Sequence, residues 1–209
     1  DIKERYRIKQ DAELEELMDV IASTIGGLTN PQKLENTFKT VKNVQLSKQT
    51  IKTYLDILNK TMTVCPLQKF SPSEIKEKQS VPKMQVYNSG FRNRYGLFSF
   101  DEARSNPTEW GHQVESAVGA HLANRSVLDG FELLYWRNDK KQECDYVLKK
   151  GQALVAIEVK SSRAEDTSGF EKFKEMYSDR VTSSFIVGPE GLPLEDFFSL
   201  DLNVLFKSL

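Results

Sequence analysis

Four charged side chains in the second half of the chain have types and spacing that suit chemistry on a phosphate: Glu143, Asp145, Glu158 and Lys160. Carboxylate oxygens suit hard cations such as Mg²⁺, which commonly uses one or two carboxylates and keeps several waters. An ion shared by Asp145 and Glu158 would polarise a phosphoryl oxygen and lower the pKa of a bound water. Lys160 would position or deprotonate that water, or neutralise charge on the phosphate. The residues therefore favour phosphodiester hydrolysis, and a surface cluster of salt bridges is the alternative.

A predicted β-hairpin brings these four residues together. The apolar run 153–160 has the composition of a buried strand. The run 143–149 can pair back onto it across a two-residue turn at Lys150 and Gly151, because glycine accepts a positive φ. Side chains alternate along a strand and opposed residues share a face, so all four charged groups are expected on one face of the sheet. Such a cluster is costly for stability, which indicates a functional role.

Helices and further strands are predicted around this hairpin. A helix begins at Asn106-Pro107-Thr108, and Glu115 lies at the edge of its apolar stripe, where a solvated helix acid is the simpler interpretation. Additional segments have strand or helix patterns: strands at 131–137 and 183–187, and a helix at 167–177. The order helix, three strands, helix, strand predicts an α/β layer with one sheet flanked by helices.

The first part of the chain has a different pattern. Three short amphipathic helices are expected at 11–27, from Asn30 onward, and at 47–60, followed by an extended stretch at 61–70. This outline matches a winged helix-turn-helix, in which 47–60 would be the recognition helix. We therefore predict two domains, a winged-helix-like helical domain at 1–80 and an α/β domain at 81–209, with 71–83 as a linker or loop.

Charge is unevenly distributed over the helical unit. Residues 30–69 contain seven lysines against two acidic residues, which leaves a net charge of +5. Lys48 and Lys52 are expected on the exposed side of the third helix, where they can contact DNA phosphates. Solvated helix surfaces, or a winged helix that serves as a protein-interaction module, are the alternatives.

The amino-acid composition is that of a globular protein without a membrane span or a zinc site. The chain has 209 residues and a net charge of −1, with 39 % hydrophobic and 28 % charged residues, as in a soluble globular protein. It lacks a long apolar run and a signal-peptide pattern, so we expect no membrane span and a cytoplasmic location. Two cysteines far apart and only two histidines make a zinc site improbable.

Asp145, Glu158-Val159-Lys160 and a preceding helix with Glu115 resemble the PD-(D/E)xK nuclease superfamily. More narrowly, the chain is similar to an uncharacterised C-terminal domain of a bacterial and archaeal AAA-type ATPase family. The similarity extends over nearly the whole chain and includes these segments: 14–24, 48–58, Pro82-Lys83, Asn88-Ser89-Gly90, Val114-Glu115, Tyr135-Trp136-Arg137, Glu143-Cys144-Asp145 and Ile157–Ser162. In that family the domain follows a P-loop ATPase module, which a chain beginning at Asp1 would lack.

The resemblance implies a winged-helix unit followed by a PD-(D/E)xK nuclease-like domain with the order α-β-β-β-α-β. It implies that Glu115, Asp145 and Glu158 bind Mg²⁺ or Mn²⁺ and that Lys160 is catalytic together with Asp145 and Glu158. We expect Lys48, Lys52 and Arg137 to contact nucleic acid. No G-x-x-x-x-G-K-[ST] motif occurs, so this chain is not expected to contain an ATPase site.

Three functions remain open from the sequence. The first is a Mg²⁺-dependent endonuclease that acts on DNA. The second is a non-catalytic, nuclease-like module that binds DNA or senses it for the ATPase. The third is a protein-interaction domain whose partners are the ATPase module of the same protein or a second copy of the chain.

Overall fold

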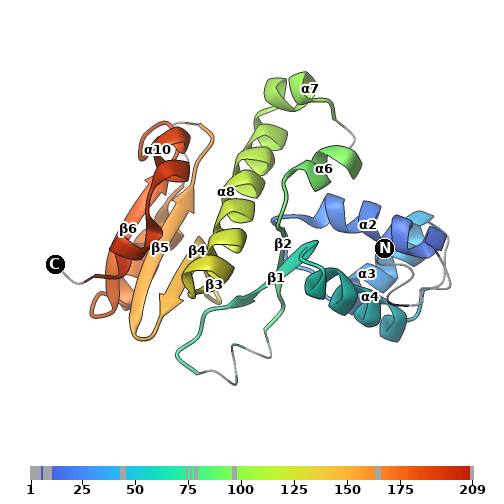
Figure 1. The fold of residues 1–209 in the computed structure, drawn as a ribbon, viewed down its shortest axis with the longest axis horizontal. Helices are drawn as coiled ribbons and strands as arrows, with labels where there is room; N and C mark the ends of the chain where they lie inside the picture. The colour runs from blue at the N-terminus through green and yellow to red at the C-terminus, as the bar shows by residue number, and fades with distance from the viewer. Residues whose placement is uncertain are drawn as a thin grey trace.

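The computed structural model describes Tyr6 and residues 11–42, 46–73, 75, 77, 80–95, 98–162 and 166–207. These residues form a mixed α/β structure (Figure 1). Its strands are β1 (Val64–Lys69), β2 (Lys83–Val86), β3 (Glu132–Arg137), β4 (Glu143–Lys150), β5 (Ala153–Val159) and β6 (Val181–Val187). They form a six-stranded mixed sheet in the order β2-β1-β3-β4-β5-β6.

The sheet connects the two halves of the chain. β1 pairs with β2 in antiparallel and with β3 in parallel orientation. The pairs β3–β4 and β4–β5 are antiparallel, and β6 runs parallel to β5. A strand from before residue 80 therefore hydrogen-bonds to strands after it, so the sheet is continuous across the predicted domain boundary.

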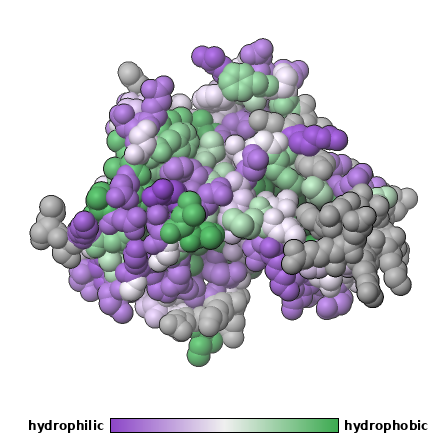
Figure 2. Space-filling view, in the orientation of Figure 1, coloured by the Kyte–Doolittle hydropathy of each residue, from purple (hydrophilic) through white to green (hydrophobic). Residues whose placement is uncertain are grey.

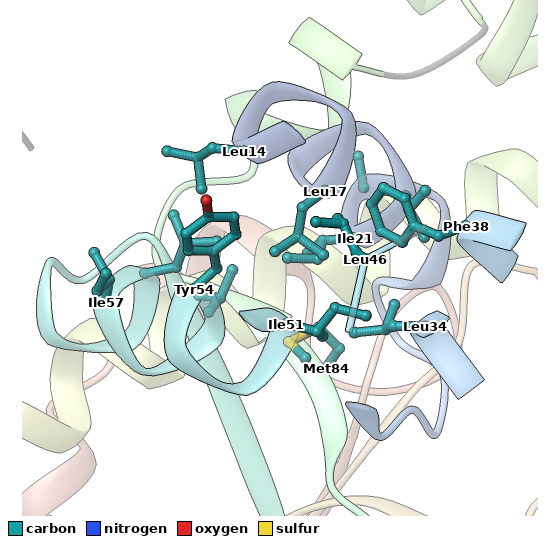
Figure 3. Packing of buried hydrophobic residues seen from close by; sticks show 14 of the residues in the cluster. Leu14, Leu17, Ile21, Leu34, Phe38, Leu46, Ile51, Tyr54, Ile57 and Met84 are labelled. Atoms are coloured by element: carbon teal, nitrogen blue, oxygen red, sulfur yellow. The ribbon is translucent and has the colours of Figure 1, made fainter. Parts of the chain in front are cut away.

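The first helices lie where the sequence pattern predicts them. They are α2 (Asp11–Thr24), α3 (Pro31–Thr37), the π-helical turn η1 (Phe38–Lys42) and α4 (Lys48–Lys60). The side chains of Asn30 and Ser47 accept hydrogen bonds from the first turns of α3 and α4, as expected for N-cap residues. Figure 3 shows the core that these helices share, in which Met84 of β2 packs close to Ile51 of α4.

The remaining helices flank the sheet. They are α6 (Gly90–Tyr95), α7 (Phe100–Ser105), α8 (Pro107–Asp129), α9 (Ser168–Met176), α10 (Leu194–Ser199) and the 3₁₀ turn η2 (Leu202–Phe206). Val118 of α8 and Phe173 of α9 belong to different core clusters, with Leu148 in the first and Val147 in the second. The two helices therefore cover opposite faces of the sheet. The element order from α8 to β6 is α-β-β-β-α-β, as the sequence predicts.

The long helix α8 has clear end signals. The Asn106 side chain accepts hydrogen bonds from the backbone N–H groups of Thr108 and Glu109, and Pro107 occupies the first turn. Gly130 ends the helix in the left-handed region at φ 67°. In Figure 1, α8 lies between the helices α2, α3 and α4 and the strands β4, β5 and β6. Its N-terminal half is thus placed to bring Glu115 to the sheet.

The segment predicted as a linker at 71–83 ends earlier than expected. Lys83 is the first residue of β2, and its backbone lies opposite Leu67 of β1. Within the described ranges, no helix is both long and apolar enough to cross a membrane. Hydrophilic residues cover much of the face shown in Figure 2, with hydrophobic residues between them.

Candidate functional site

A buried lysine lies at the centre of the acidic cluster. The Nζ atom of Lys83 lies 2.8 Å from Oε1 of Glu115, 2.9 Å from Oε1 of Glu143 and 3.4 Å from Oδ1 of Asp145. The Lys83 side chain is only 3 % exposed. Its ammonium also lies 5.6 Å from the centre of the Tyr146 ring. The structure therefore brings three carboxylates from α8 and β4 onto one cation from β2.

Asp145 connects this group to the end of β5. Its Oδ2 atom accepts a hydrogen bond of 2.9 Å from the backbone N–H of Val159. In return, the backbone N–H of Asp145 donates to Oε2 of Glu158 at 3.3 Å. Lys160 Nζ lies 2.8 Å from Oε1 of Glu158. Asp145, Glu158 and Lys160 thus form one connected group.

The hairpin that carries these residues has a different register from the expected one. Lys150 pairs with Ala153, so the two-residue turn consists of Gly151 and Gln152 rather than Lys150 and Gly151. Gly151 has a φ of +61°, which explains why glycine is favoured there. The predicted turn was therefore wrong by one position, which moves the partner of Lys149 by two residues, from Gln152 to Leu154.

A β-bulge in β4 changes the direction of the Asp145 side chain. Leu134 pairs with Val147 while Trp136 pairs with Cys144, so β4 has an extra residue here. Bulges break the strict alternation of side chains and often occur next to functional sites. Cys144 and Val147 consequently lie in the same core cluster, on the α9 side. Asp145 lies in this bulge, and its carboxylate reaches both Lys83 and the β5 backbone.

Electrostatics at the site depend on burial. Burial by itself would lower the pKa of Lys83, but the carboxylates of Glu115, Asp145 and Glu143 raise it well above its ordinary value. Lys83 is therefore a permanent cation. Burial raises the pKa of Glu115, and the Lys83 charge opposes this shift.

The surroundings of Glu158 disfavour the ionised form of its carboxyl group. Burial, followed by the negative charge of Asp145, raises the pKa of Glu158 to about 8, although Lys160 opposes the shift. The Glu158 residue is 5 % exposed. A carboxyl group with this pKa is mostly protonated at neutral pH unless a further cation approaches, so the site favours additional positive charge.

An open cavity of about 390 Å³ lies beside the acidic cluster. Asp145, Glu115 and Lys160 line it, together with the first turns of α8 and the residues after β5: Pro107, Thr108, Gly111, His112, Val159, Ser161 and Ser162. Burial lowers the pKa of His112, and the nearby Arg92 charge adds to this effect. The cavity therefore has carboxylate, ammonium, imidazole and hydroxyl groups on its wall, a lining that suits a polar, charged ligand.

The donor set is compatible with a single hard divalent cation at Asp145 and Glu158. Mg²⁺ is commonly bound by one or two carboxylates and waters. Burial and then the nearby charge of Asp145 raise the pKa of Glu158, and a bound cation would oppose both effects. No group of three or more His, Cys, Asp or Glu residues in the described ranges is arranged to hold a metal ion. Glu115, expected from the resemblance to bind metal, contacts Lys83 instead.

The residues expected to bind nucleic acid lie in two places. Lys48 and Lys52 are exposed on α4, as the helix pattern predicts. Figure 1 shows α4 on the side of the molecule away from β5 and β6. Arg137 lies at the end of β3, with its Nη1 atom 3.5 Å from Oε2 of Glu143, and lines a second cavity of about 700 Å³. Arg137 is thus connected to the acidic cluster, whereas the two lysines are not part of it.

Lys83 is the site residue that the sequence reasoning missed. It belongs to the Pro82-Lys83 segment that carries part of the resemblance, yet it received no role. A lysine that begins a short strand gives a weak signal, because most lysines are exposed. Only the packing of β2 against α8 shows that its ammonium is buried among carboxylates from α8 and β4.

Two family models match this chain, each over less than half of it. Residues 110–198 match a domain of unknown function (DUF4143), which is found in ATPase-associated proteins. Residues 1–101 match another domain of unknown function (DUF8612). No curated protein and no solved structure matches the chain. Lys83 lies in the first matched region, and Glu115, Glu143, Asp145, Glu158 and Lys160 lie in the second.

Proposed function

We propose that this chain binds DNA and hydrolyses a phosphodiester bond with the help of one divalent cation, Mg²⁺ or Mn²⁺. The observation that carries the proposal is the connected group of Asp145, Glu158 and Lys160 beside an open polar cavity. The order α-β-β-β-α-β supports a PD-(D/E)xK nuclease-like fold for this part, and α2, α3 and α4 followed by β1 and β2 support a winged helix. Fold similarity is an analogy for activity, so the argument depends on the site.

Each residue of the group has a distinct role in this proposal. Asp145 and Glu158 would hold the cation, which when bound polarises a phosphoryl oxygen and acidifies water. The Val159 N–H fixes one oxygen of Asp145, so this carboxylate is oriented before substrate binds. The Nζ atom of Lys160 contacts Oε1 of Glu158 at 2.8 Å in the free protein, and Lys160 lines the cavity where the phosphate would be placed. There it would stabilise negative charge that develops on the phosphate.

The decisive experiment measures cleavage of linear, circular and branched DNA with and without Mg²⁺ or Mn²⁺. Glu158→Gln and Lys160→Met should each lower the rate at least about 100-fold, the scale expected when an electrostatic stabiliser is removed. Glu195→Gln and Lys207→Met change exposed residues that do not line the cavity and should leave the rate unchanged. If folded protein binds Mn²⁺ but cuts none of these DNA forms, the chain is not a nuclease for them.

A non-catalytic module that directs an ATPase is the second candidate. The match to a domain found in ATPase-associated proteins favours it, as does the neutralisation of the acids by Lys83. Its partners would be DNA, an ATPase module of the same protein or a second copy of the chain. It predicts salt-sensitive DNA binding through Lys48 and Lys52 without turnover, or self-association with no DNA affinity at moderate salt.

A further inference from the structure

Lys83 reaches the acids from a part of the chain that carries none of them. β2 places it opposite Leu67 of β1, and an isolated bridge joins it to Leu28. The adjoining backbone is fixed on both sides, because Thr29 N–H donates to the carbonyl of Pro82 and Met84 N–H donates to the carbonyl of Gly27. The lysine is thus held by the segment that follows α2, and its ammonium has little freedom to leave.

Carboxylates outnumber the ammonium group of Lys83 at contact distance, and Arg137 Nη1 lies 3.5 Å from Oε2 of one of them, Glu143. Three carboxylates, those of Glu115, Glu143 and Asp145, surround one ammonium group at 2.8 to 3.4 Å. These are ammonium–oxygen distances, longer than the roughly 2.0–2.6 Å of Mg²⁺ or Ca²⁺ to oxygen. The oxygens converge on one point nevertheless, and a lysine nitrogen fills that point.

We infer that Lys83 is a built-in cation that takes the place of a second metal ion, so that the acidic site loads a single divalent cation, at Asp145 and Glu158. This inference rests on the proposed function for the first ion, but the role of Lys83 can be measured without any DNA cleavage. Two-metal sites for phosphoryl transfer hold their ions about 3.5–4 Å apart and share carboxylates between them. Here the carboxylate of Asp145 contacts the ammonium of Lys83 through Oδ1 and the backbone N–H of Val159, next to Glu158, through Oδ2.

The ammonium of Lys83 is attached to the chain, so it cannot dissociate from the site as a metal ion can. Lys83 and the acids lie in separately matched regions of the chain, and the segment after α2 positions the lysine. The matched region at residues 1–101 therefore supplies one charge of the acidic site. The occupancy of that position cannot respond to the concentration of divalent ions in solution.

The test counts Mn²⁺ ions bound per chain, by electron paramagnetic resonance of free Mn²⁺ and by calorimetry. Wild type should bind a single ion. Lys83→Ala should bind a second, because three carboxylates then surround an empty position. Lys83→Ala combined with Glu115→Gln and Glu143→Gln should return to a single ion. Lys140→Ala, which changes an exposed lysine, should behave like wild type.

A second variant tests the inference without disturbing Lys83. If Lys83 is the partner of Glu115, Glu115→Gln should change Mn²⁺ affinity less than about threefold, whereas loss of a group that supports a bound metal typically costs 10–100-fold. Two ions in wild type, no more ions in folded Lys83→Ala than in wild type, or a loss above about threefold in Glu115→Gln would each overturn the inference. No ion in wild type and one in Lys83→Ala would support the role of Lys83 and contradict the proposed metal site at Asp145 and Glu158.

Discussion

Asp145 Oδ2 accepts a 2.9 Å hydrogen bond from the backbone N–H of Val159, the residue between Glu158 and Lys160. The bond lies beyond the last regular pair of the β4–β5 ladder, Tyr146 with Ile157. The Asp145 side chain thus joins β4 to β5 at the bulge, where the backbone pairing between the two strands has ended. The same carboxylate contacts Lys83 through Oδ1, so Asp145 orients both halves of the acidic site.

Replacing Asp145 with alanine should destabilise the fold by about 1–3 kcal/mol, because the Val159 N–H loses its acceptor at a poorly solvated position. Urea denaturation followed by circular dichroism measures this change. Asp139→Ala, at an exposed position after β3, is the matched control and should stay within about 0.5 kcal/mol of wild type. Equal stability of the two variants would show that the bond contributes little.

Lys83→Met should lower the free energy of unfolding by about 3–5 kcal/mol, because removing one partner of a buried charge cluster leaves the carboxylates uncompensated. Lys140→Met is the control, since Lys140 is exposed. Chemical denaturation at pH 7 without divalent ions gives both values. Addition of Mn²⁺ should recover part of the loss in Lys83→Met only, since the ion would replace the missing charge.

The stability of the protein should depend on the ionisation of Glu158. Its pKa in the folded state is about 8, above the ordinary value of 4.5, so the folded state keeps a proton that the unfolded state releases. The free energy of unfolding attributable to this group therefore falls as the pH rises from about 5 to about 8. Glu158→Gln removes this dependence.

The variant Glu158→Gln should thus gain stability relative to wild type as the pH rises, by an amount on the order of a few kcal/mol at pH 8 to 9. The difference should be smallest near pH 5, and saturating Mg²⁺ should reduce it by stabilising the ionised carboxylate in wild type. Thermal denaturation at a series of pH values measures this. A constant difference between the proteins across that range would contradict the raised pKa.

Lys48 and Lys52 should contribute to DNA affinity through phosphate contacts. Lys48→Glu and Lys52→Glu should each weaken binding similarly for unrelated sequences and reduce the slope of log K against log salt by about 1. Fluorescence anisotropy with labelled duplexes at several salt concentrations gives the slope. Lys207→Glu, with the same charge change at an exposed position near the C-terminal end of the described residues, serves as control. If wild type and the three variants all have the same slope, α4 is not a DNA-binding helix.

The sequence by itself determined most of the elements. Asn30, Ser47 and Asn106 cap helices because their side chains accept hydrogen bonds from free N–H groups of the first turn, a local interaction visible in the sequence. The apolar run 153–160 likewise located β5, which is buried on both faces, and the turn at Gly151 led back to β4. The group of Asp145, Glu158 and Lys160 followed from these elements and their order.

The register of the hairpin and the role of Lys83 were decided by the tertiary structure. Turns of adjacent register around Gly151 are close in local energy, and packing of β4 and β5 between α8 and α9 selects one of them. Lys83 lies 32 residues before Glu115 and 60 before Glu143, and no pattern in its local sequence predicts a contact with either residue. Its burial among carboxylates follows from β2 joining the sheet beside α8, because long-range electrostatic contacts depend on distance in space, which local sequence patterns do not encode.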